Sequence, residues 1–193
     1  MPTITPTPEE MARRIARFSQ LDRIVMQREA RFPQDALDVI YARRLHPVIG
    51  LPDTDTPIND SAPIRGAGGM TITYAVCPPG QGPSLHSHNR TYETFTVCRG
   101  RFEFLWGDNG EHSVVLEELD VLSVPPCVCR AFRNIGSIEG VLQVIITGGV
   151  HDKTDIAFPI STAVKIARVN PRLYEHLRET GHALPELPLE ERG

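Results

Sequence analysis

The sequence predicts an all-β fold, either a sandwich or a closed barrel, with helical segments added at both ends of the chain. In the middle of the chain, short runs rich in β-branched and aromatic residues follow one another closely, and turn signals such as Pro78-Pro79-Gly80 separate them. The 17 prolines and 15 glycines also indicate many short elements joined by turns. Short strands at this spacing are typical of sandwiches and barrels.

The length and the charge limit the class of protein. A chain of 193 residues can form one domain with a substantial core and some extra segments. The net charge of -4 argues against a nucleic-acid surface, which would need a basic footprint. No apolar run approaches the length of a membrane-spanning helix, and the polar, proline-containing start does not resemble a secretory signal. We therefore expect a cytoplasmic protein that binds neither nucleic acid nor a membrane.

Helices are expected on both sides of the β region. Residues 8–30 predict a helix in which Thr7 is the cap, because apolar residues recur there at helical spacing. A second helix is predicted over residues 34–44, and residues 47–69 predict an irregular connector or edge segment. A last helix is expected over residues 171–180, and the acidic tail after it is expected to be disordered or laid across a neighbouring surface.

The expected strands divide the chain into three parts. They lie at residues 70–77, 84–88, 92–98, 101–106, 113–117, 121–124, 128–132 and 141–147. We therefore expect an N-terminal helical extension at residues 1–46, a β-barrel at residues 47–150 and a C-terminal segment at residues 151–193.

The most informative stretch runs from Gly80 to Gly100. His86 and His88 are one residue apart, so on a β-strand they project side by side from one face. Glu93 follows five residues later and can bring a carboxylate to the same place. Two imidazoles and a carboxylate can form three corners of a metal site. These three residues are therefore the candidate metal ligands.

The spacing of this stretch resembles the first signature of the cupin superfamily, G-x5-H-x-H-x4-E-x6-G, and every fixed position is filled. The resemblance implies a double-stranded β-helix, also called a jelly-roll barrel. It also implies that His86, His88 and Glu93 hold a divalent metal ion.

The second cupin signature, G-x5-P-x-G-x2-H-x3-N, falls on residues 119–134 and is only partly filled. Pro125 and Asn134 match it. Three positions depart from it, because two glycines and a histidine are replaced by Leu119, Cys127 and Arg130. In the family that histidine is the fourth protein ligand, so the departures concern the metal chemistry rather than the fold.

Arg130 leaves two arrangements open. An arginine is not available as a ligand, and a guanidinium about 4 Å from a divalent ion would feel roughly 8 kcal/mol of repulsion at an effective dielectric near 20. In the first arrangement its side chain reaches past the metal and clamps an anionic substrate. In the second it pairs with Glu93, and the pocket holds no metal. We favour the first, because all three remaining ligand positions are filled.

Other candidates have simpler alternatives. Phe95, Phe132 and Trp106 are candidates for a substrate pocket, but aromatic side chains also pack barrel cores. Gln143, alone among apolar neighbours, either binds a ligand or faces solvent. His151 is a more distant candidate for an extra ligand.

The four cysteines are expected to be free thiols. A thiolate from Cys127 or Cys129 would replace the missing ligand and favour zinc. Strand alternation instead favours a turn position for Cys127, and it directs Cys129 away from Arg130.

The residues and the resemblance together predict a metal-dependent enzyme that acts on a small, anionic organic molecule, with Arg130 as the residue that orients it. Fe(II) is the favoured ion, because two histidines and one carboxylate suit non-haem iron and oxygen chemistry, as in a dioxygenase. Zinc, nickel or manganese would instead support a lyase or isomerase. A non-enzymatic protein that binds a small acid through Arg130 and Glu93 is the further alternative. A homodimer is expected, because the apolar stripe of the predicted N-terminal helix needs an apolar surface on which to pack.

Overall fold

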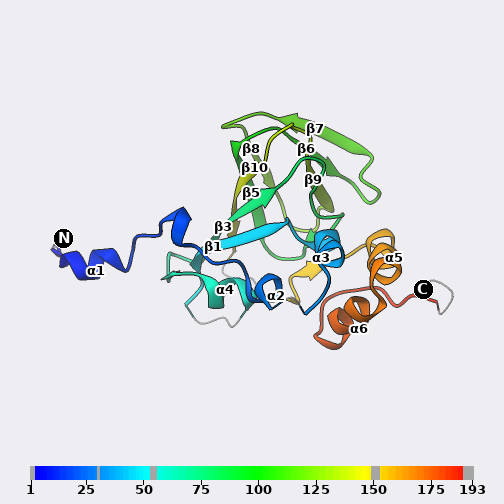
Figure 1. Cartoon of the computed structure of the whole chain (residues 1–193), viewed down its shortest axis with the longest axis horizontal. Coiled ribbons are helices and arrows are strands. Elements are labelled where there is room, and N and C mark those ends of the chain that lie inside the picture. Colours follow the sequence, from blue (N-terminus) through cyan, green and yellow to red (C-terminus); the bar gives the residue numbers. More distant parts are fainter. Residues whose placement is uncertain (1–2, 30, 53–55, 149–152, 189–193) are drawn as a thin grey trace.

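The computed structural model describes residues 3–29, 31–52, 56–148 and 153–188. In Figure 1 the strands form a barrel in the upper part of the view, and most of the helices lie together below it. The first helix stands apart from the rest of the molecule on the left of the same view. None of the helices in the described part of the chain combines the length and the apolar character needed to span a bilayer.

The larger sheet has six strands in the order β2-β1-β3-β10-β5-β8. They are β1 (Arg44–Gly50), β2 (Ile64–Arg65), β3 (Met70–Cys77), β5 (Tyr92–Arg99), β8 (Val121–Val124) and β10 (Gly140–Thr147). The long strand β10 pairs antiparallel with both β3 and β5. Its alternate residues Leu142, Val144 and Ile146 are buried, which places one face of the sheet against the barrel core.

The opposite wall of the barrel is built from two smaller sheets. One has the order β7-β6-β9 and contains β6 (Phe102–Trp106), β7 (His112–Leu116) and β9 (Arg130–Asn134). The other pairs β4 (Ser87–His88) with β11 (Ile156–Ala157). An isolated bridge between His86 and Arg130 connects them. The predicted fold class, a double-stranded β-helix with helices at both ends, is confirmed.

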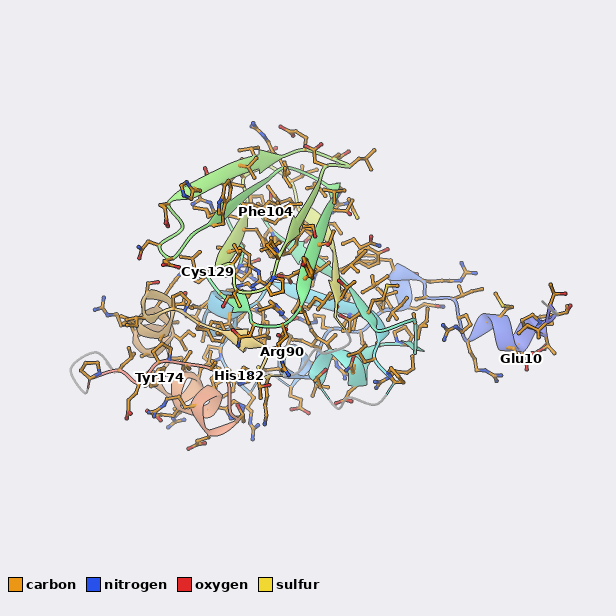
Figure 2. The ribbon with its side chains drawn as sticks, turned by 180° about the vertical axis from the view of Figure 1, so that it is seen from behind. Glu10, Arg90, Phe104, Cys129, Tyr174 and His182 are labelled. Carbon is orange, nitrogen blue, oxygen red and sulfur yellow. The ribbon has the colours of Figure 1, made fainter. Side chains whose placement is uncertain are left out.

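The molecule has two hydrophobic cores. One fills the barrel and contains a cluster of four phenylalanines, Phe95, Phe102, Phe104 and Phe132. The other lies among the helices α3 (Gln34–Ile40), α5 (Ile160–Val169) and α6 (Pro171–Glu179). Figure 2 shows Phe104 within the barrel and Tyr174 among the C-terminal helices. The helices from both chain ends therefore pack on each other next to the barrel.

The long helix predicted over residues 8–30 is wrong. The described residues instead form α1 (Pro8–Ala12), the 3-10 helix η1 (Phe18–Gln20) and α2 (Val25–Arg28). Thr7 does cap α1, through a capping box with Glu10. However, Met11 and Ile15 are 47% and 54% exposed, so the burial that stabilises most protein helices is missing. The expected homodimer, which would cover such residues, stays a prediction.

Two further segments lie next to the barrel in the sequence. The helix predicted over residues 34–44 ends at Ile40, and β1 begins at Arg44. Of the two alternatives for residues 47–69, the edge segment is confirmed, because the rest of β1 and β2 form the edge of the larger sheet, with helix α4 (Pro57–Ser61) between them in the chain. Helix α5 and strand β11 were not predicted. The division of the chain into three parts stays a prediction.

The end of the described chain packs against the last helix. Helix α6 begins as predicted, with the Asn170 side chain accepting a hydrogen bond from Leu173 N at 2.8 Å. Beyond it, Leu187 is 2% exposed, and its N–H donates to the Tyr174 hydroxyl at 3.0 Å. Of the two alternatives for the tail, its described part is laid across a neighbouring surface.

Two residues of the second cupin signature have left-handed backbone. Leu119 has a φ of 72° and Cys127 a φ of 64°. Both stand where that signature has glycine, the residue that adopts this region without a steric cost. The turns are therefore retained although the side chains have changed, and each costs roughly 1–2 kcal/mol relative to glycine. Leu119 is 79% exposed, so packing recovers little of this cost.

The variant Leu119→Gly should therefore be more stable than the natural chain. Relief of the left-handed strain, about 1–2 kcal/mol, exceeds the extra unfolded-state entropy of glycine, about 0.5–1 kcal/mol. The free energy of unfolding, measured by urea denaturation, should rise by about 0.5–1 kcal/mol. Val121→Gly is the matched control, because Val121 is exposed on strand β8 and should lose stability instead. A loss of stability in both variants would contradict the strain argument.

Candidate metal centre

Backbone pairing places the two histidines opposite the segment that carries Arg130. The His86 N–H donates to the Arg130 carbonyl oxygen at 3.0 Å, and the Arg130 N–H donates back to the His86 carbonyl at 2.9 Å. Nearby, the Cys127 N–H donates to the His88 carbonyl at 2.7 Å. Glu93 comes from the opposite wall, on strand β5 of the larger sheet. The candidate site therefore bridges the two walls of the barrel.

The three candidate ligands converge in space. One possible ligand atom from each of His86, His88 and Glu93 lies within 4.8 Å of the other two. The distance from His88 Nε2 to Glu93 Oε2 is 3.8 Å. His88 and Glu93 are buried, whereas His86 is partly exposed. The short spacing read from the sequence therefore corresponds to a compact group of side chains.

Fixed hydrogen bonds orient both imidazole rings. His86 Nδ1 lies 2.9 Å from the Ser84 carbonyl oxygen, and His88 Nδ1 lies 2.8 Å from Asp155 Oδ2. A carbonyl and a carboxylate only accept hydrogen bonds, so Nδ1 is the protonated nitrogen in each ring. Each Nε2 then carries the lone pair that binds a metal ion. Histidines that bind metals are commonly held in this way.

Arg130 forms the ion pair with Glu93 that was expected in the second of the two arrangements. Its Nε donates to Glu93 Oε2 at 2.9 Å, and its Nη2 forms an ion pair with the same oxygen. Its Nη1 donates to the His86 carbonyl at 3.1 Å. The side chain is buried, and it is not among the described residues that line the adjoining cavity. The guanidinium is therefore committed to the protein, which argues against the clamp on a substrate.

Burial and the Arg130 charge set the protonation of the site. Burial lowers the pKa of His86 to about 3, and the positive charge of Arg130 adds to this effect. Burial alone would raise the pKa of Glu93, but Arg130, assisted by His88 and His86, brings it down to about 2. At neutral pH the site therefore presents a neutral His86 and an ionised Glu93. These are the protonation states that metal ligands need.

The candidate ligands line a cavity of about 90 Å³ between the barrel and the helices. Its other walls are mainly apolar and come from both cores, through Ile40, Ala75, Phe132, Val144, Ile146, Phe158 and Leu177. A second cavity of about 450 Å³ shares with it the wall residues Tyr41, Ile58, Ile156 and His182, and is also lined by Arg31 and Lys153. His182 lies at the junction of barrel and helices in Figure 2.

The structure separates the other pocket candidates. Phe132 lines the smaller cavity, whereas Phe95 is fully buried within the phenylalanine cluster. Trp106 is 36% exposed and lies beside His112, with ring centroids 5.5 Å apart. Gln143 alternates on β10 with the buried Leu142, so its side chain is on the outer face of the sheet. Trp106 and Gln143 therefore do not contribute to the site.

The cysteines do not supply a missing ligand. Cys127 is exposed in a turn, as expected, and its Sγ lies 3.4 Å from the Asn89 carbonyl. Cys129 is half-buried, and burial raises the pKa of its thiol. Neither belongs to the group of possible ligands found among the described residues. His151 lies outside the described residues.

Asp155 and Thr91 are residues of the site that sequence reasoning missed. Asp155 is fully buried, and its Oδ2 accepts hydrogen bonds from both His88 Nδ1 and Thr91 Oγ1. Asp155 lies 67 positions after His88, in the segment between β10 and β11. A lone aspartate at that distance carries no local signal, so only the fold could reveal it.

A comparison with family models identifies the domain that forms the barrel. Residues 73–146 match the model described as the cupin domain. The chain contains a cupin domain. The match covers strands β3 to β10 and therefore all three candidate ligands of the cupin site. Asp155, β11, α5 and α6 lie beyond its end. No protein among the curated sequences matches the chain.

Several solved structures resemble this cupin at low identity. One is a protein of Klebsiella pneumoniae with a double-stranded β-helix domain, with 20% identity over 47% of this chain and 70% of that chain and a TM-score of 0.42. Another is a structure of DMSP lyases, with 18% identity over 60% of this chain and 51% of that chain and a TM-score of 0.46. A predicted oxalate decarboxylase of Thermotoga maritima has 22% identity over 40% and 64% and a TM-score of 0.37. At such values none of them bears on what this chain does.

The residues present in this cupin fit a divalent ion. Both imidazoles offer Nε2, the carboxylate is ionised, and the three possible ligand atoms are close together. The Arg130 charge opposes a cation, but it is offset by Glu93, and the buried Asp155 carboxylate adds a further negative charge beside His88. His86, His88 and Glu93 can therefore hold a metal ion, whose identity the donor set leaves open.

The buried ion pair between Arg130 and Glu93 should contribute to the stability of the fold. Arg130→Met should lower the free energy of unfolding by about 3–5 kcal/mol, because it leaves the buried Glu93 carboxylate unpaired. Adding Glu93→Gln to that variant should recover part of the loss, since no buried charge then remains. Urea denaturation of the metal-free single and double variants measures both effects. Additive losses in the double variant would contradict a direct pairing.

The lowered pKa of His86 should make the free energy of unfolding depend on pH. Because the folded-state pKa is about 3, the unfolded chain binds a proton that the folded protein does not bind between about pH 6.5 and pH 3. The metal-free protein should therefore lose stability as the pH falls through this window. His86→Gln removes the titrating group, so its stability should decline less steeply. Parallel curves of unfolding free energy against pH would exclude His86 as the cause.

Proposed function

We propose that this cupin is a metal-dependent enzyme that acts on a small organic molecule, with Fe(II) as the favoured ion. The main support is the pair of fixed imidazole tautomers beside an ionised carboxylate, lining one cavity. A divalent ion held there supplies a Lewis-acid centre or, if it is iron, a centre for oxygen chemistry of the dioxygenase type.

The surrounding residues have separate roles in this proposal. Arg130 fixes the orientation of the Glu93 carboxylate through two nitrogens on one oxygen. The apolar walls of the cavity exclude water and select a small, largely apolar reacting group. An acidic group on the substrate would meet Arg31 and Lys153 in the second cavity, in place of Arg130. This keeps the expectation of an anionic substrate but assigns its recognition to other residues.

Two alternatives follow from particular observations. The Arg130–Glu93 pair supports a cupin that binds a small acid without catalysis, because the pair balances its own charge without a metal. The same donor set also suits zinc, nickel or manganese, with which a lyase or isomerase reaction would need no oxygen. The identity of the bound ion separates all three functions.

Metal analysis of protein purified without an affinity tag tests the proposal. Near-stoichiometric iron, lost in His88→Ala and kept in His112→Ala, is the expected result. His112 is the matched control, because it is an exposed histidine on β7 beside Trp106. Zinc, nickel or manganese in the same amount would favour the lyase or isomerase. If no metal binds after loading with each of these ions, the result would favour the protein that binds a small acid without catalysis.

A further inference from the structure

Asp155 binds the histidine segment through separate oxygen atoms. Its Oδ1 accepts a hydrogen bond from the Arg90 N–H at 2.7 Å, and its backbone carbonyl accepts one from the Asn89 N–H at 2.7 Å. These two contacts hold the turn that follows β4. Its Oδ2 instead faces His88 Nδ1 at 2.8 Å and Thr91 Oγ1 at 2.6 Å. One oxygen therefore serves the backbone, and the other serves the ring of a candidate ligand.

Thr91 completes a closed set of hydrogen bonds around the His88 ring. Its hydroxyl donates to Asp155 Oδ2, which leaves the hydroxyl oxygen free to accept from His88 Nδ1 at 3.0 Å. The Nδ1–H therefore has two acceptors. All three side chains are buried, so water does not compete for these bonds. The protonated nitrogen of His88 is thus fixed by its surroundings.

The position of Asp155 is secured by the segment that contains it. Ile156, the next residue, pairs with His88 across the β4–β11 ladder. Farther along, the Thr162 hydroxyl donates to the Leu85 carbonyl at 2.8 Å, just before the histidines. The segment therefore lies along the whole histidine strand. Burying a carboxylate costs several kcal/mol unless it is well paired, and three hydrogen-bond donors to the Asp155 carboxylate offset this cost.

We propose that Asp155 is a positioning residue for the site, which holds His88 in the Nδ1–H tautomer and directs its Nε2 to the ligand group. The inference rests on the proposed metal function for its effect on affinity, but not for the tautomer itself. It also means that the cupin-domain residues 73–146 do not form the site alone, because the C-terminal segment supplies this carboxylate.

The variant Asp155→Asn tests this role in the full-length, metal-free protein. An asparagine has one acceptor oxygen, so it cannot serve both Arg90 N–H and the His88–Thr91 pair. Nitrogen-15 NMR of the histidine side chains should show His88 as the Nδ1–H tautomer in the natural chain and a shift toward Nε2–H in the variant. Thr162→Val is the matched control, because it loosens the same segment without touching the ring, and its His88 signals should stay unchanged.

Metal titration gives the second measurement. With zinc or cobalt as the probe, Asp155→Asn should raise the dissociation constant roughly 10–100-fold. A loss of this size is common when the partner of a ligating histidine is removed. Thr162→Val should bind close to the natural chain. If Asp155→Asn does not fold, Thr91→Val, which removes one donor to Oδ2, should show a smaller change in the same direction.

Unchanged His88 signals in a folded Asp155→Asn protein would overturn the inference. An equal shift in Thr162→Val would also overturn it, because the effect would then come from looser packing. If the natural chain binds no metal but the tautomer still changes in Asp155→Asn, the inference stands and the metal function fails. The two proposals can therefore be told apart.

Discussion

The ion pair between Arg130 and Glu93 is the interaction on which the site depends. It joins β9 of the smaller wall to β5 of the larger sheet, and both charges are almost completely removed from water. A buried charge is tolerated only when a partner compensates it, so neither side chain can turn away without a large loss. The pair therefore fixes the distance between the two walls at the place where the histidines and the glutamate meet.

The same pair explains how the barrel accommodates arginine at the position where the cupin signature has a histidine. The guanidinium does not take the place of an imidazole at the metal but bonds to the carboxylate and to the His86 carbonyl. Its charge keeps Glu93 ionised and helps to keep His86 neutral. With Arg130 at this position, the site offers three candidate protein ligands, and a bond from Arg130 orients one of them. Recognition of a substrate then falls to other parts of the cavity wall.

Helices from both sides of the barrel sequence contribute to the wall of the cavity. The barrel supplies the candidate ligands and part of an apolar wall, while α3, α4 and α6 add further wall residues. Helices α3, α5 and α6 also form a core of their own. The C-terminal segment also brings Asp155 to the back of the His88 ring. The cavity is therefore a product of the whole chain, although the residues that give it chemical character lie within the cupin match.

The sequence by itself determined the barrel strands and the three candidate ligands, because strand alternation and short spacing fix how His86, His88 and Glu93 project. It failed over residues 8–30, where the first part of the apolar pattern, including Met11 and Ile15, stays exposed in the described chain. It also could not assign the partner of Arg130 or find Asp155. Those depend on groups 37 and 67 positions apart, which only the closed fold brings together. Tertiary structure decided them because the cost of burying a charge depends on what surrounds it, and local sequence does not contain that information.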